Sequence, residues 1–105
     1  MLKLKEDIPP TFEAPVDLRL PGGKIKTFYA EYRYLTEKQY AAFVAEDPER
    51  NFRDTLLKLT VSWRNIDLAF DEDGFDELTD YCPGAPLAML QAYHRERHGL
   101  PRKNS

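Results

Sequence analysis

The alternation of apolar and polar residues predicts two β-strands near the start of the chain. From residue 12 to residue 20 every second residue is apolar, and the residues between them are polar or proline. The same alternation returns at residues 28–34. A repeat of two residues is typical of a strand with one buried face. The intervening Pro-Gly-Gly-Lys favours a turn, so we predict a β-hairpin, in which Pro15 makes the first strand start late or lie at an edge.

The next segment predicts two helices. Thr36 and Gln39 have the spacing of a capping box, which marks a helix N-terminus, and Pro48 ends that helix. Asn51 is the predicted N-cap of a second helix, whose apolar residues recur at helical spacing as far as Trp63. The last residues of this segment also alternate, so a strand remains an alternative there. Length and the N-cap favour the helix.

Two further helices are predicted in the last third of the chain. A short one covers residues 75–82 and ends at Pro83-Gly84. Pro86 suits the first turn of the last helix, and Gly99 suits the position just after its end. The apolar face of this last helix is predicted to consist of Leu87, Leu90 and Tyr93.

The predicted fold class is therefore α+β, with an N-terminal β-hairpin followed by about four α-helices. The chain has 105 residues, the size of one ordinary domain. We predict a single domain over residues 1–105, with residues 1–10 as a flexible N-terminal arm and residues 100–105 as a frayed tail.

Composition narrows the class of protein. Apolar residues make up 42% of the chain and charged residues 31%, which is typical of a folded globular domain. The net charge of −3 argues against a nucleic-acid binder, which is usually basic. Apolar runs all fall short of the ~20 residues that span a membrane, so no membrane partner is expected. The single Cys82 cannot form an internal disulfide, which fits a reducing cytoplasm.

The acidic stretch Asp-Glu-Asp-Gly at residues 71–74 is the first candidate site. An EF-hand loop with this glycine in sixth place would have Ala69 first and Asp80 twelfth. Alanine has no side-chain oxygen and aspartate is shorter than the usual glutamate, so two main calcium ligands are deficient. We expect a solvated turn in which Asp73 or Asp76 caps the following helix. Solvated acids on a turn are poorly suited to general acid–base catalysis.

Two other candidates are weak for similar reasons. His94 and His98 lie four residues apart on a predicted helix, which allows two histidines to share a metal ion. The motif is not HExxH and lacks a third ligand nearby, so a cationic helix end is the better interpretation. Cys82 lies at a helix C-terminus, which disfavours a reactive thiolate, and we expect a small buried apolar residue. We therefore predict no catalytic, cofactor-binding or metal site, no cofactor, and no enzymatic activity.

The aromatic residues favour a protein-binding surface instead. They reach 12% of the chain. Tyr, Trp and Arg side chains contribute most of the binding energy at protein interfaces. Tyr29 falls on the outward face of the predicted hairpin, near Arg33, although it can also simply cover a helix. Trp63 is either part of the core or a contact. The candidate partner-binding residues are Tyr29, Arg33, Trp63 and Tyr93.

The order of these features resembles that of phage tail assembly chaperones. The resemblance covers about Val16 to Asn104. A strand ends at LPGGK, and the aromatic strand in FYAEYRYLTEKQY leads into a helix. A segment ending at Trp63, a D-x-D-G turn, CPGAPLAMLQAYHRERHG and Lys103-Asn104 follow in the same order.

This resemblance implies a protein that acts by binding. Such chaperones hold the tape measure protein, the long helical chain that sets tail length, and keep it soluble until the tail tube polymerises around it. The resemblance also implies the tail tube protein as a second partner, the host bacterial cytoplasm as location, and absence from the mature virion. A homo-oligomer remains open. The alternative function is a small cytoplasmic protein-interaction module or antitoxin-like regulator.

Overall fold

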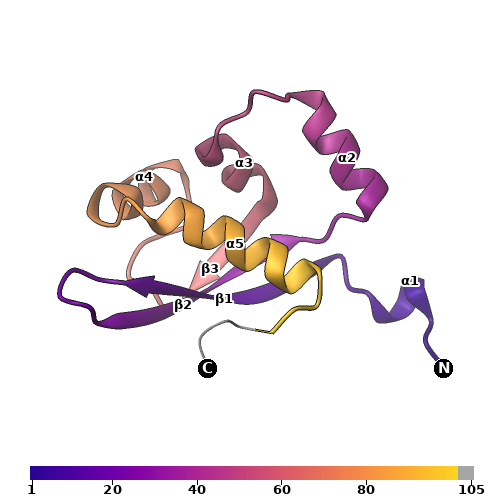
Figure 1. The fold of residues 1–105 in the computed structure, drawn as a ribbon, viewed down its shortest axis with the longest axis horizontal. Helices are drawn as coiled ribbons and strands as arrows, with labels where there is room; N and C mark the ends of the chain where they lie inside the picture. Colours follow the sequence, from indigo (N-terminus) through magenta and orange to yellow (C-terminus); the bar gives the residue numbers. More distant parts are fainter. Residues whose placement is uncertain (102–105) are drawn as a thin grey trace.

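The computed structural model describes residues 1–101 (Figure 1). Residues 102–105, with Lys103-Asn104 and most of the predicted frayed tail, lie outside the described residues. The fold is mixed α+β, with a three-stranded antiparallel sheet in the order β1-β2-β3. The elements are α1 (Leu4–Asp7), β1 (Thr11–Arg19), β2 (Ile25–Arg33), α2 (Glu37–Glu46), α3 (Phe52–Leu59), β3 (Thr60–Arg64), α4 (Glu72–Tyr81) and α5 (Ala85–Arg97).

The predicted hairpin is confirmed. β1 and β2 pair antiparallel over nine residue pairs, from Thr11 opposite Arg33 to Arg19 opposite Ile25. The turn contains two glycines with φ of 92° and 90°, a region of backbone space that favours glycine. β1 is an edge strand, as Pro15 requires, because proline has no N–H to donate to a ladder.

The predicted continuation of helix as far as Trp63 is wrong. α3 ends at Leu59, and β3 pairs antiparallel with β2, with Tyr29 opposite Arg64. The pairing contains a bulge between Glu31 and Tyr32 of β2. The strand alternative is the one that forms. β-Branched residues begin this segment, and the free edge of β2 offers it a ladder of backbone hydrogen bonds, which a two-stranded hairpin alone lacks.

The helices and the sheet share one core. Within residues 1–101, α3, α4 and α5 lie over one face of the sheet and leave the opposite face open (Figure 1). The hydroxyl of the fully buried Tyr32 donates a hydrogen bond to the Met89 carbonyl at 2.8 Å, which joins β2 to α5. The buried core residues are Ala14, Val16, Leu18, Phe28, Ala30, Tyr32, Leu56, Leu59, Phe75, Leu78, Ala85, Met89, Ala92 and Tyr93.

The buried face of α5 differs from the predicted one. Tyr93 is buried, but Leu90 is only half-buried and Leu87 is 48% exposed. The stripe that faces the sheet consists of Ala85, Met89, Ala92 and Tyr93. Small alanines on this stripe let the helix lie close to the strands, which apolar periodicity alone does not reveal.

The N-cap of α4 is Asp71, and the prediction of Asp73 or Asp76 is wrong. Its side chain accepts a hydrogen bond from the Gly74 N–H at 2.7 Å, so the acidic stretch forms the first turn of the helix and not a turn before it. Gly74 is required at this point, because a Cβ atom there would lie 1.9 Å from the Ala69 carbonyl oxygen.

The predicted helix ends at α2 and α5 are confirmed. In the capping box of α2, the Gln39 N–H donates to the Thr36 hydroxyl at 3.2 Å, and the Thr36 N–H donates to the Gln39 side chain at 3.0 Å. At the end of α5, Gly99 has φ of 70° and the Leu100 N–H donates to the Arg95 carbonyl at 2.8 Å. This pattern closes a helix with a left-handed residue.

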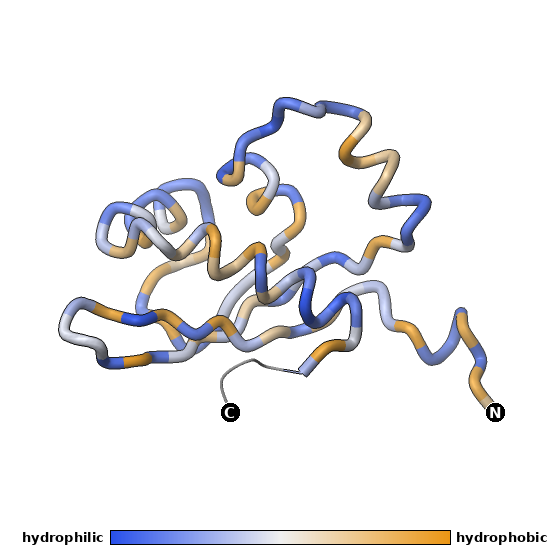
Figure 2. The backbone as a smooth tube through the Cα atoms, in the orientation of Figure 1, coloured by the Kyte–Doolittle hydropathy of each residue, from blue (hydrophilic) through white to orange (hydrophobic). Residues whose placement is uncertain are grey.

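Two helices lie at the periphery of the core, although Tyr40 and Phe43 of α2 pack against it. None of the residues of α1 or α2 is buried, and both helices project from the body of the molecule (Figure 1). Apolar residues occupy the later part of α2, whereas apolar and polar residues alternate along residues 1–10 (Figure 2). No helix within residues 1–101 combines the length and apolar character of a membrane span.

Candidate functional site

The structure separates the four predicted partner-binding residues. Tyr29 and Arg33 lie on the open face of the sheet, whereas Trp63 lies on the opposite face and Tyr93 is fully buried. The Trp63 ring packs edge-on against Phe28 and its indole N–H donates to a backbone carbonyl, so it serves the core. Tyr93 offers no surface to a partner, and its assignment as a contact residue is corrected.

Burial also explains the electrostatics of Tyr93. Its ring lies 5.6 Å from the Phe12 ring and 5.2 Å from the Tyr32 ring. Loss of hydration raises the pKa of the Tyr93 phenol to about 12, because burial disfavours the phenolate. The group is therefore neutral at physiological pH.

On the open face, Tyr29 belongs to a network with Arg64 and Glu13. The Arg64 guanidinium lies 4.1 Å from the centre of the Tyr29 ring and donates two hydrogen bonds to the Glu13 carboxylate, at 2.8 and 2.6 Å. These bonds lower the pKa of Glu13. Neighbouring Glu31 accepts from the hydroxyls of Thr11 and Ser62. The open face is thus a polar surface on which Glu13, Glu31 and Arg64 already have partners within the chain.

Sequence reasoning missed Arg64 in this network. The residue stands opposite Tyr29 only because residues 60–64 form a strand. The alternation of apolar and polar residues up to Trp63 was the signal that could have placed it there.

An apolar hollow lies between α2, α3 and α5. Its volume is about 170 Å³, close to that of an apolar cavity of about 150 Å³ that can hold a benzene ring. Val44 on α2 is 44% exposed and Phe52 on α3 is 50% exposed, and both line the hollow. We call this site the α2 hollow, and its lining residues are Tyr40, Phe43, Val44, Asp47, Pro48, Arg50, Phe52, Thr55 and Leu90.

Polar contacts near its two ends attach α2 to the rest of the protein. At the first turn, the nearly buried Arg97 donates to the Leu35 carbonyl at 2.8 Å and to Glu37 at 2.6 Å. At the far end, Arg50 donates to the Phe43 carbonyl at 3.1 Å and lies over the Phe43 ring. Between these ends, the Tyr40 ring of α2 stacks on the buried Tyr93 ring of α5, with 6.5 Å between the ring centres.

His94 contributes a further contact to α2. Its Nε2 lies 3.4 Å from the Tyr40 hydroxyl, and the two rings meet edge-on. Burial lowers the pKa of His94, and the nearby positive charges of Arg97 and His98 lower it further. The neutral imidazole is therefore the favoured form at this contact.

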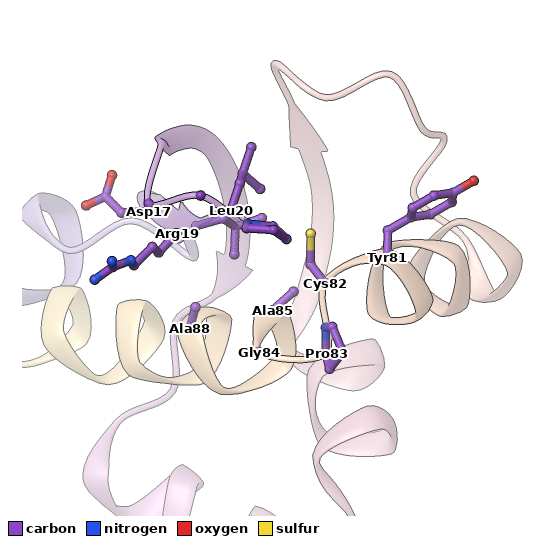
Figure 3. Close-up of a pocket in the computed structure, with 13 residues that line it drawn as sticks. Asp17, Arg19, Leu20, Tyr81, Cys82, Pro83, Gly84, Ala85 and Ala88 are labelled. Atoms are coloured by element: carbon purple, nitrogen blue, oxygen red, sulfur yellow. The ribbon is translucent and has the colours of Figure 1, made fainter.

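A second concave region lies at the turn end of the hairpin, which we call the hairpin-end groove. Two adjoining hollows of about 600 and 650 Å³ share the lining residues Leu18, Leu20, Tyr81 and Cys82. The Arg19 guanidinium and the Tyr81 ring lie at opposite ends of the first hollow, and the Cys82 sulfur points toward the side where Leu20 lies (Figure 3). Cys82 is half-buried, so the expectation of a buried residue holds only in part.

The candidate metal ligands remain apart. The rings of His94 and His98 are 6.4 Å apart, and no three His, Cys, Asp or Glu side chains within residues 1–101 are grouped to hold a metal ion. On α4, Asp76 and Glu72 pair with Arg53 at 2.8 and 3.1 Å. The hydrogen bond from Arg53 lowers the pKa of Asp76. Because Arg53 belongs to α3, this ion pair joins α4 to α3.

The described part of this small α+β domain thus combines a polar sheet face with two concave regions that have partly apolar linings. A sequence model of the phage tail assembly chaperone family matches residues 1–104, so the chain belongs to that family. The match includes the arm at residues 1–10, and it indicates a non-enzymatic role in tail assembly. Comparisons with curated proteins and with solved structures gave no match.

Proposed function

We propose that this chain binds the tape measure protein and keeps it soluble in the host cytoplasm during tail assembly. The observation that carries the proposal is the apolar α2 hollow in a member of a tail assembly chaperone family. In this role the protein leaves before the virion matures, and the tail tube protein is a second partner.

The proposed mode of binding is a helix in a groove. An amphipathic helix of the tape measure protein places one large apolar side chain in the α2 hollow and others against its rim. Val44 of α2 and Phe52 of α3 both line the α2 hollow and are about half exposed, so both have apolar surface left to bury. Covering apolar stripes on the partner's helices prevents those stripes from associating with one another.

The affinity must allow release when the tail tube assembles. A Kd near ~1 µM, which corresponds to roughly −8 kcal/mol, meets this need. Full burial of a Phe or Val side chain contributes about 1.5–3 kcal/mol, so the exposed halves of Phe52 and Val44 contribute about 1 kcal/mol each. Two anchors of this size supply a useful fraction of the binding energy and leave the complex reversible.

Co-expression with the tape measure protein of the same phage genome tests the proposal. The chain is expected to keep the tape measure protein in the soluble fraction and to be recovered with it in a pull-down at micromolar protein. The variants Val44→Asp and Phe52→Asp are expected to lose both effects, since a charge in the α2 hollow must be desolvated.

The matched control is Ile25→Asp. Ile25 is also 50% exposed but lies on the hairpin, away from the α2 hollow. It is expected to behave like the unmodified chain. Failure of the unmodified chain to recover any tape measure protein would refute the proposal and favour the alternative, an antitoxin-like or other protein-interaction module.

A further inference from the structure

The arm at residues 1–10 carries apolar side chains that the rest of the described chain leaves uncovered. Leu2 is 70% exposed and Leu4 is 63% exposed. The short helix α1 is held by a hydrogen bond from the Lys3 N–H to Asp7 at 2.9 Å. Leu4 and Ile8 are one helical turn apart and so lie on the same side of the arm. This side is a small amphipathic surface without a partner within residues 1–101.

The hairpin-end groove is the complementary surface. Most of the lining of its larger hollow is apolar, from Leu18, Leu20, Ile66, Leu68, Leu78, Tyr81 and Cys82. Its charged lining residues are Asp67 and Glu77 against Lys26. Glu77 belongs to α4, a helix with five acidic residues and no basic one. The arm carries Lys3 and Lys5 together with Glu6 and Asp7, and because Lys3 lies 3.7 Å from Glu6, Lys5 is the lysine left to face an acidic wall.

The arm cannot fill the groove of its own chain. The arm and the hairpin turn lie at opposite ends of the longest dimension of the molecule, which measures 45 Å (Figure 1). The arm is joined to the sheet at Thr11, the first residue of β1, and β1 alone extends for about 30 Å from there to the groove. Ten extended residues span about 35 Å at most, so only the first few residues could arrive. Leu4 and Ile8 would remain outside.

We propose that the arm of one copy docks in the hairpin-end groove of a second copy. Leu4 and Ile8 cover the apolar floor around Leu18 and Leu20, and Lys5 of the arm lies beside the acidic wall of α4. The arm and the groove lie at opposite ends of the molecule, so the arm of one copy meets the groove of the other either in an antiparallel pair or in a head-to-tail row. A reciprocal exchange of arms closes a two-fold dimer, and a contact made in one direction only continues into an open row or closes into a ring. The association needs no tape measure protein.

Sedimentation measurements on the isolated chain give the first test. Up to about 1 mM chain, the weight-average mass is expected to rise with concentration from the 12.2 kDa of one chain to twice that mass or more. The double variant Leu4→Glu/Ile8→Glu is expected to remain at the mass of one chain, whereas Val44→Glu, a change at another exposed apolar residue, associates like the unmodified chain. Constant monomer mass, or equal association by the arm variant, would overturn the proposal.

Disulfide trapping gives a second test that locates the contact, because Cys82 lines the groove and is the only cysteine. A tagged chain with Leu4→Cys/Cys82→Ser is mixed with the unmodified chain and mildly oxidised. The mixed disulfide is expected to exceed both homodimers several-fold. In the control, Ala45→Cys/Cys82→Ser replaces the arm variant and gives only statistical amounts. Statistical amounts from the arm variant as well would place the arm elsewhere and refute this contact.

Discussion

The buried tyrosines Tyr32 and Tyr93 form a matched pair whose hydroxyl groups are predicted to affect stability in opposite ways. Both side chains are fully buried, and their rings are 5.2 Å apart. The Tyr32 hydroxyl donates to the Met89 carbonyl at 2.8 Å. The Tyr93 hydroxyl is buried without a hydrogen-bond partner among residues 1–101. Substitution by phenylalanine removes one oxygen from each site and leaves the packing of the rings intact.

The expected magnitudes follow from these contacts. A buried hydrogen bond contributes about 0.5–1.5 kcal/mol, so Tyr32→Phe is expected to lower the free energy of unfolding by about 1 kcal/mol. A buried hydroxyl without a partner is desolvated without compensation, so Tyr93→Phe is expected to leave stability unchanged or raise it by up to about 1 kcal/mol. For a domain of this size, 1 kcal/mol shifts Tm by about 4–8 °C.

Urea unfolding followed by the fluorescence of Trp63, together with thermal unfolding by circular dichroism, measures both variants. Unchanged m-values would show that each substitution alters stability and not the extent of unfolding. Equal losses in Tyr32→Phe and Tyr93→Phe would contradict the reasoning. The position of α5 over the sheet, which gives the two hydroxyls their different surroundings, would then be wrong.

Three further predictions concern single residues. Gly74→Ala is expected to lower the free energy of unfolding in urea by at least about 2 kcal/mol, because the Cβ of the new alanine would meet the Ala69 carbonyl. A decrease of less than about 0.5 kcal/mol would refute this close approach. Asp71→Ala removes the cap of α4 and is expected to cost about 1 kcal/mol, whereas Asp71→Asn retains most of it. The pKa of His94 in the folded chain is lowered from 6.5, so the unfolded chain binds a proton at this residue more readily, and the free energy of unfolding falls as pH drops below 6.5. His94→Gln is expected to reduce this loss of stability. An unchanged dependence of stability on pH would exclude His94 as its cause.

Local signals in the sequence predicted local structure well. The hairpin turn, the capping box at Thr36 and the glycine ending of α5 each depend on residues that are neighbours in the chain. Their backbone preferences act over a few residues, so tertiary packing has little opportunity to override them.

Features that depend on packing were harder to predict. Residues 60–64 form a strand because the free edge of β2 is available for pairing. Packing against the sheet determines which residues of α5 are buried. The α2 hollow and the hairpin-end groove each combine elements that are distant in the sequence. Of the predicted contact residues, Tyr93 is buried and Trp63 packs against the core. The sequence did not reveal this, because aromatic character indicates burial and binding equally well.

The most direct test of the central claim is the Kd between this chain and the tape measure protein of the same phage, measured by titration calorimetry. The account predicts a Kd near ~1 µM for the unmodified chain and for Ile25→Asp. It predicts at least about tenfold weaker binding for Val44→Asp and for Phe52→Asp, since each loses more than 1.4 kcal/mol. Absence of binding by the unmodified chain, or equal affinity in all four proteins, would contradict the assignment of the α2 hollow as the chaperone site.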